Sequence, residues 1–149
     1  MQLRKSSLYA LRAALEMASV KGPVTVADVA RRHGFPVTAL AKVMQELVRA
    51  GIALGSRGVG GGYVLARDAA AISTLQVIEV FDPDRCGDDA RSPADGLDQL
   101  LDEIDEVTRC TFASVSLETL ARRTRRDRNA VAVDAPGILR RKAPGPKPS

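Results

Sequence analysis

The 149-residue sequence contains no tryptophan, and its few tyrosines and phenylalanines make up only 3% of the residues. Proteins that bind single-stranded nucleic acids stack the bases on aromatic side chains, so this shortage argues against that class. The single histidine, His33, belongs to no recognisable Ser/His/Asp constellation. Because nucleophilic and acid–base catalysis need such sets of residues, the sequence does not indicate an enzyme.

Cysteine is also scarce, since Cys86 and Cys110 are the only two and cannot form a disulfide framework. Long hydrophobic runs are missing as well. Residues 1–5 lead directly into an amphipathic segment without the apolar core of a signal peptide, and no run approaches the length of a membrane span. These absences predict a cytoplasmic protein with no membrane partner.

Charge is distributed unevenly along the chain, although the net charge is only +4. Residues 1–67 contain ten Lys/Arg and three Asp/Glu. Residues 82–106 contain two Lys/Arg and ten Asp/Glu, and residues 122–149 contain nine Lys/Arg and two Asp/Glu. A basic first half suggests an anionic partner, although charge alone also fits a solvated basic surface. Apolar residues make up 45% of the chain, which is ample for the core of one ordinary domain.

Apolar residues at helical spacing predict a first helix over residues 6–20. Leu8 and Leu11 belong to its expected apolar face. Ser6 or Ser7 is the expected N-cap, because a serine hydroxyl can accept a hydrogen bond from a free backbone N–H.

Two further helices follow at close spacing. One is expected from Val26 to Arg32 with Thr25 as its N-cap, and the other from about Val37 to Ala50 with Gly51 after its C-terminus. A tight turn that contains Gly34 joins them. This is the pattern of a helix-turn-helix.

A glycine-rich stretch over residues 55–67 comes directly after these helices. Strands are expected over residues 52–56 and 63–66, so the glycines form the turn of a β-ribbon. The turn lacks the Gly-Lys-Ser/Thr of a nucleotide-binding loop and lies inside a hairpin, which argues against nucleotide binding. A helix-turn-helix followed by a β-ribbon predicts a winged helix, and a fold that is mainly α with a small β-wing.

The remaining chain is expected to be helical around one polar loop, residues 82–96. A fourth helix should run from Thr74 to Phe81, and a long helix from about residue 93 or 94 to Ala113. Ser116 is the expected cap of a short last helix that ends at Arg123. From Thr124 the chain is rich in Arg and then in Pro and Gly, which predicts a disordered tail.

One apolar stripe follows the long helix, and acidic residues occupy the rest of its surface. Such a stripe outside a compact domain needs a partner. Packing within the chain would satisfy it, but we expect a second copy of the same helix. The predicted dimerisation residues are Leu97, Leu100, Leu101, Ile104, Val107 and Thr111.

In a helix-turn-helix the second helix lies in the major groove of DNA. Gln45 can pair with adenine and Lys42 with guanine or phosphate, while Arg57 at the wing tip can probe a narrow minor groove. The same residues could instead be solvated surface residues. The predicted DNA-binding set is Arg4, Lys5, Tyr9, Arg31, Thr38, Ala39, Lys42, Gln45, Arg57, Gly58, Gly60, Gly61 and Gly62, with Ala41 and Arg67 as further candidates.

Five segments of the sequence form a recognisable set. They are residues 8–13, 22–24, 27–30, 47–52 and, most specific of all, the wing Arg57-Gly58-Val59-Gly60-Gly61-Gly62-Tyr63-Val64-Leu65-Ala66. Together they resemble the Rrf2 family of bacterial regulators over residues 1 to about 120. That family includes the iron–sulfur cluster regulator, the nitric-oxide-sensing repressor and the cysteine-metabolism repressor. The resemblance implies a winged-helix domain, a long dimerisation helix and a homodimer that binds palindromic promoter DNA.

The sequence departs from this family in two places. Many members hold an iron–sulfur cluster with three closely spaced cysteines, whereas here Cys86 matches the first and residues 87–96 contain none. A cluster needs four ligands, so we expect no cofactor and no metal site; a cluster that bridges two subunits through Cys86 and Cys110 is the alternative. In the recognition helix, Ala39 and Ala41 stand where the resemblance implies Tyr and an acidic or amide residue, so no known operator carries over.

We therefore predict a homodimeric, sequence-specific DNA-binding transcriptional regulator that represses by occluding a promoter, with an unknown effector. A redox or electrophile sensor through Cys86 is one alternative, because Arg85 favours its thiolate although neighbouring aspartates oppose it. A protein-interaction module that uses the acidic helix is another.

We expect Cys110 to pack against the stripe, and His33 to cap its helix or touch phosphate. The expected units are a DNA-binding domain (1–81), a sensor-type loop (82–96), dimerisation and short C-terminal helices (97–123) and a tail (124–149).

Overall fold

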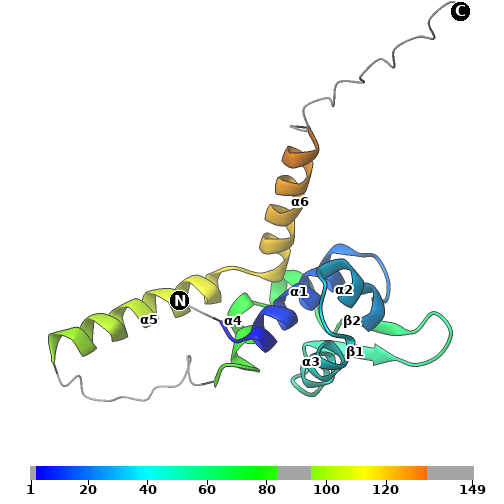
Figure 1. Cartoon of the computed structure of the whole chain (residues 1–149). Coiled ribbons are helices and arrows are strands. Elements are labelled where there is room, and N and C mark those ends of the chain that lie inside the picture. Colours follow the sequence, from blue (N-terminus) through cyan, green and yellow to red (C-terminus); the bar gives the residue numbers. More distant parts are fainter. Residues whose placement is uncertain (1–2, 84–94, 134–149) are drawn as a thin grey trace, which may run out of the picture.

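The computed structural model of the chain describes residues 3–83 and 95–133. In this part the fold is mainly helical with one small antiparallel sheet (Figure 1). None of the described helices is both long and apolar enough to cross a membrane. In chain order the elements are α1 (Lys5–Ser19), α2 (Val26–His33), α3 (Val37–Arg49), β1 (Ala53–Ser56), β2 (Gly62–Leu65), the 3-10 helix η1 (Ala69–Ala71), α4 (Thr74–Glu79), α5 (Gly96–Ser114) and α6 (Leu117–Val133).

The core lies among α1, α2, α3 and α4. From α3, Leu40, Met44 and Leu47 are fully buried, and Val29 of α2 packs in the same cluster. On α1 the prediction was partly wrong, because Leu8 is exposed and three alanines make much of the buried face. Small side chains let α1 pack closely against neighbouring helices, which explains why its alanines and not its first leucine face the core.

Local signals at the helix ends are confirmed. The Thr25 hydroxyl accepts a hydrogen bond from the Asp28 N–H at 3.1 Å and so caps α2. Gly34 ends α2 with φ 67°, and Gly51 follows α3 with φ 71°. Both glycines have the left-handed conformation that helix C-termini favour. These caps fix the short connection that sets α3 against α2.

The expected cap of α1 was wrong. The helix begins at Lys5, and its N-cap Arg4 makes no side-chain capping hydrogen bond. Ser7 lies inside the helix and is fully buried, where its hydroxyl donates to the Asp82 carboxylate at 2.6 Å. A distant acceptor from the end of α4 therefore decides the role of this serine.

The wing is a two-stranded ribbon in which Ala53 pairs with Leu65 and Ser56 pairs with Gly62. Val24, just before α2, adds a β-bridge to Tyr63 through two backbone hydrogen bonds of 2.9 Å. This bridge ties the base of the wing to the helix-turn-helix. Both strands therefore leave the body at a fixed position beside α3.

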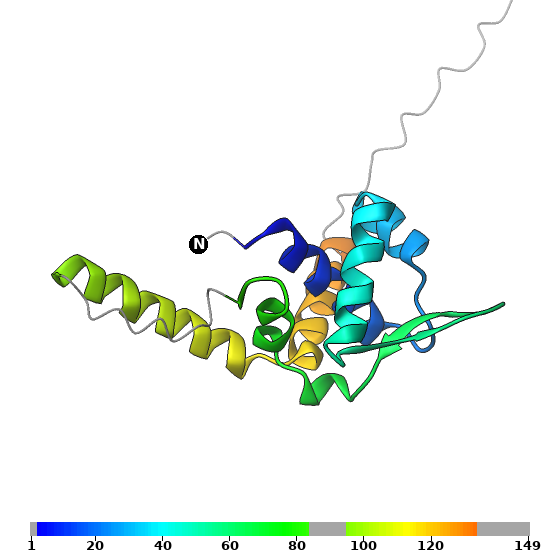
Figure 2. The ribbon, with the colours of Figure 1, turned by 90° about the horizontal axis from the view of Figure 1, so that it is seen from below.

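Beyond the wing, Ser73 and Gln76 form a reciprocal capping box at the start of α4. Helix α5 begins at Gly96, slightly later than expected, with the Asp95 side chain as its cap. It projects away from the winged-helix body in both views (Figures 1 and 2). In contrast, α6 is anchored in the body, since Leu117 is fully buried and Ala121 nearly so.

The expected end of the last helix at Arg123, with a disordered tail from Thr124, was wrong for residues 124–133. Helix α6 continues to Val133. No glycine or proline occurs between Arg123 and Pro136, and Arg125 also donates to the Ser19 backbone oxygen of α1 at 2.9 Å. Residues 134–149, the rest of the predicted tail, lie outside the described residues.

Candidate DNA interface

Helix α3 presents a polar face opposite its buried face. Thr38, Lys42 and Gln45 are exposed at intervals of four and three residues, so they lie along one side of the helix. Ala39 and Ala41 are half-buried. The base-reading groups expected from the sequence are therefore accessible to a nucleic acid, but the alanines offer only a limited methyl surface.

A groove joins α3 to the wing. Gln45 lines it from the helix side, and Arg57 and Ser56 line it from the ribbon. Val48 also lines this groove and is 36% exposed. Arg49 also lines it while it pairs with Glu46 at 2.6 Å. Neither residue was predicted as a site residue from the sequence. Arg49 could have been found, because it lies one helical turn after Gln45 and so on the same side of the helix.

The wing tip consists of exposed residues around a glycine turn. Gly58 and Gly60 have φ angles of 106° and 78°, and the Gly61 N–H donates to the Gly58 oxygen at 2.9 Å. A Cβ atom on Gly61 would lie 2.5 Å from the Ser56 oxygen. The turn thus needs glycine for its conformation and for its close backbone contacts, and it leaves Arg57 exposed beside bare peptide groups.

The predicted phosphate contacts of the helices fall into two groups. Lys5 and Arg31 are exposed, although Arg31 already pairs with Asp28 at 2.7 Å. Arg4 is engaged with the buried carboxylate of Asp82 at 2.8 Å. Tyr9 is half-buried and packs on Phe35, with 4.2 Å between the ring centroids. Because Phe35 lies in the turn before α3, this tilted ring contact helps to position α3.

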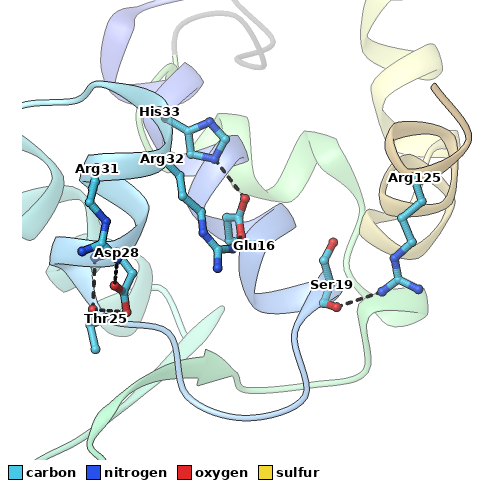
Figure 3. Close-up of polar contacts among 8 residues, drawn as sticks. All are labelled: Glu16, Ser19, Thr25, Asp28, Arg31, Arg32, His33 and Arg125. Carbon is cyan, nitrogen blue, oxygen red and sulfur yellow. Dashed lines mark hydrogen bonds and ion pairs between the residues drawn. The ribbon is translucent and has the colours of Figure 1, made fainter. Parts of the chain in front are cut away.

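His33 neither caps its helix nor stands free for phosphate, so that expectation was wrong. Its Nε2 atom lies 3.1 Å from Oε1 of Glu16, and Arg32 donates to Oε2 of the same carboxylate at 2.7 Å (Figure 3). The Glu16 side chain is only 6% exposed. A buried carboxylate needs such partners, which explains why the two residues at the end of α2 point toward α1.

Cys110 does not pack against the stripe, so this expectation was also wrong. It is exposed on α5, and its thiol donates to the Glu106 carboxylate at 3.4 Å. This hydrogen bond and the carboxylate charge raise the pKa of the Cys110 thiol, and the same hydrogen bond together with Arg109 lowers the pKa of Glu106. A raised pKa reduces thiolate reactivity. Cys86, the predicted redox residue, lies outside the described residues.

The described residues contain no group of three His, Cys, Asp or Glu side chains that could hold a metal ion. Within this part of the chain Cys110 is the only thiol, and His33 is bound to Glu16. An iron–sulfur cluster is held mainly by cysteine thiolates. The donor set of the described residues therefore does not fit such a cluster.

Comparison with known proteins gives a consistent assignment. Residues 3–123 match the family model Rrf2, described as an iron-dependent transcriptional regulator. Among curated proteins, the chain is 33% identical over 126 residues to BadM of Rhodopseudomonas palustris, an HTH-type transcriptional regulator by name, covering 80% of this chain and 81% of BadM. It is also 33% identical over 133 residues to the HTH-type transcriptional regulator IscR of Xenorhabdus nematophila, covering 82% of this chain and 80% of the relative.

Solved structures share the fold. The global cysteine regulator CymR of B. subtilis aligns with a TM-score of 0.73 at 23% identity, over 81% of this chain and 96% of CymR. IscR of T. potens aligns with a TM-score of 0.71 at 21% identity, over 83% of this chain and 88% of that one.

Proposed function

Since this chain belongs to the Rrf2 family of transcriptional regulators, we propose that it acts as a homodimeric repressor that occludes a palindromic promoter. The family consists of DNA-binding regulators and not of enzymes. In the proposed complex each protomer places α3 in a major groove and its wing in the adjacent minor groove. The protein would act in the cytoplasm, where promoter DNA is found.

One observation carries the DNA-binding mode, namely that Gln45 of α3 and Arg57 of the wing line the same groove. A base-reading amide and a cation from two elements can therefore contact one DNA segment. Lys42 and Thr38 extend this surface along the exposed side of α3. Of the remaining predicted contacts, Lys5 and Arg31 would position the protein on phosphates without reading sequence.

The homodimer is supported by the apolar stripe of α5. No residue of α5 is buried in the described part of the chain. Five large apolar side chains lie half or more exposed along one side, and a second copy of α5 would remove them from water. They are Leu97 (62%), Leu100 (52%), Leu101 (50%), Ile104 (51%) and Val107 (68%), with Thr111 also exposed on the same side.

We further propose that the regulator works without an iron–sulfur cluster. The chain offers two cysteines and one histidine in total, and His33 is already bound to Glu16. Protein purified without oxygen should show neither iron nor visible absorption. Visible absorption with bound iron would contradict this proposal. A thiol sensor through Cys86 stays a prediction, and an unchanged oxidant response in Cys86→Ser would contradict it.

A mobility-shift assay with genomic fragments tests the main proposal. We expect one or a few fragments to shift at moderate salt, and sedimentation of the free protein to give a mass of two chains. The Gln45→Ala/Arg57→Ala double variant should lose the specific shift, whereas Lys21→Ala, an exposed lysine outside the groove, should keep it. Equal binding to every fragment would contradict sequence-specific regulation.

A further inference from the structure

A second pocket lies between the end of α1, the end of α2 and α6. It shares no lining residue with the groove between α3 and the wing. Four cationic or ionisable side chains line it together with one carboxylate, Glu16, namely Arg12, Arg32, His33 and Arg125. Figure 3 shows Glu16 facing the α2 residues, with Arg125 reaching toward α1 from the other side.

The carboxylate in the wall is already compensated. Arg32 donates to Oε2 of Glu16 at 2.7 Å, and His33 lies 3.1 Å from Oε1. Glu16 therefore does not present a free negative charge to the pocket. Its two partners fix the wall, and a ligand anion would not have to compete with an open carboxylate.

Two arginines remain to hold a ligand. Arg12 lines the pocket and is exposed, and no hydrogen bond or ion pair joins its side chain to another residue that the structure describes. Arg125 donates one N–H to the Ser19 oxygen at 2.9 Å. A guanidinium has five N–H donors, so Arg125 keeps donors for a second acceptor. The pocket thus combines two available guanidinium groups from different helices.

The wall is not polar throughout, because Leu15 and Val20 also line the pocket. Guanidinium groups bind carboxylate and phosphate oxygens in paired geometry, and an apolar wall favours an anion that carries a short hydrocarbon part. We propose that this pocket binds a small organic carboxylate, with its carboxylate on Arg12 and Arg125 and its aliphatic part on Leu15 and Val20.

Such a ligand would join three elements. Arg12 belongs to α1, the Glu16 partners Arg32 and His33 end α2, and Arg125 belongs to α6. Helix α2 leads through the Gly34 turn to α3, while α6 follows the projecting α5. A bound carboxylate would therefore hold α6 against the helices that position the recognition helix, and it would stabilise the folded chain by mass action.

Calorimetric titration of the full chain without DNA tests the pocket independently of the proposed function. The probes are sodium acetate, butyrate, malonate and phosphate, each at constant ionic strength made up with sodium chloride. We expect one saturable site per chain for a carboxylate that carries an aliphatic part. Arg12→Gln and Arg125→Gln should each weaken that binding about tenfold.

Arg123→Gln is the matched control, because it removes the same charge at an exposed position outside the pocket, on the helix that also carries Arg125. It should leave the binding constant unchanged, and circular dichroism should give the same spectrum for all three variants. Absence of saturable binding for every carboxylate would overturn the proposal. So would binding of phosphate alone, an equal loss in Arg123→Gln, or displacement of the carboxylate by duplex DNA, which would make the pocket a phosphate contact.

Discussion

Arg4 and Asp82 lie 78 residues apart in the sequence, yet the Arg4 guanidinium is 2.8 Å from the Asp82 carboxylate. The same carboxylate accepts hydrogen bonds from the Arg4 backbone N–H at 3.2 Å and from the buried Ser7 hydroxyl at 2.6 Å. Asp82 thereby binds the first turn of α1 to the segment that follows α4. Arg4, an expected phosphate contact, thus has a structural role where the first turn of α1 meets the segment that follows α4.

Replacement of Asp82 by Asn should destabilise the protein by about 1–2 kcal/mol, because Ser7 and the Arg4 N–H lose a charged acceptor. Much of the Arg4 charge interaction is screened, since its side chain is 58% exposed. Urea unfolding measures the change. Asp102→Asn, on the exposed surface of α5, is the control and should have no effect. An equal loss in both variants would refute a specific role for the buried acceptor.

Gln45 and Lys42 should differ in the kind of DNA affinity that they supply. Gln45→Ala should weaken binding to the specific operator by roughly 1–3 kcal/mol and relax preference at one base pair, because an amide reads base edges. Lys42→Ala should weaken all sequences similarly and reduce the salt dependence by about one counterion if it contacts phosphate. Fluorescence anisotropy across a salt series measures both. A uniform loss with Gln45→Ala would show that this residue does not read sequence.

The elements that define the DNA-binding body could be predicted from local sequence. Thr25 and Asp28 at one helix start, and Gly34 and Gly51 after two helix ends, act through neighbours a few residues away. Such signals are visible without a tertiary structure. For the same reason the wing, whose register depends on a short glycine turn, was found at nearly its observed bounds.

Contacts between distant segments could not be predicted in this way. From local sequence Ser7 was expected to cap a helix, but in the structure it bonds to the distant Asp82. Likewise His33 was expected to cap its helix, but it contacts Glu16 of α1. The length of α6 was missed because the Arg-rich sequence suggested solvated disorder, whereas Arg125 contacts α1. An arginine-rich segment can therefore form a helix when one of its faces packs against the rest of the protein.

The wing turn should tolerate no side chain at Gly61. A Cβ atom there would lie 2.5 Å from the Ser56 oxygen and 2.8 Å from the Gly58 oxygen, so Gly61→Ala must reshape the turn at a cost of roughly 1–3 kcal/mol. DNA affinity should fall about tenfold or more, and the free energy of unfolding should fall by no more than that cost, because the exposed tip can open locally. Gly96→Ala, whose Cβ would meet nothing within 4 Å, is the matched control. Equal operator affinity for both variants would argue against a wing contact.

A charge in the α5 stripe should separate the proposed dimer. Ile104→Glu would bury an unpaired carboxylate between two helices, which costs several kcal/mol. We expect sedimentation to give the mass of one chain and the operator affinity to fall sharply. Gln99→Glu adds the same charge to the same exposed helix but outside the stripe, and it should stay dimeric. A dimer that persists in Ile104→Glu would exclude this stripe as the interface.

Cys110 should react slowly with alkylating agents for as long as Glu106 is charged. The neutral thiol donates to the Glu106 carboxylate, whose charge also opposes the thiolate, so the pKa of Cys110 is raised. Because only the thiolate reacts, the alkylation rate should rise with pH, and this rise should occur at higher pH than for an ordinary cysteine. Glu106→Gln removes the negative charge, so the pH profile should move to lower pH and the rate near pH 8 should increase. Peptide-resolved mass spectrometry after iodoacetamide treatment separates Cys110 from Cys86, and Asp102→Asn is the control. A profile that does not move in Glu106→Gln would show that this carboxylate does not govern the thiol.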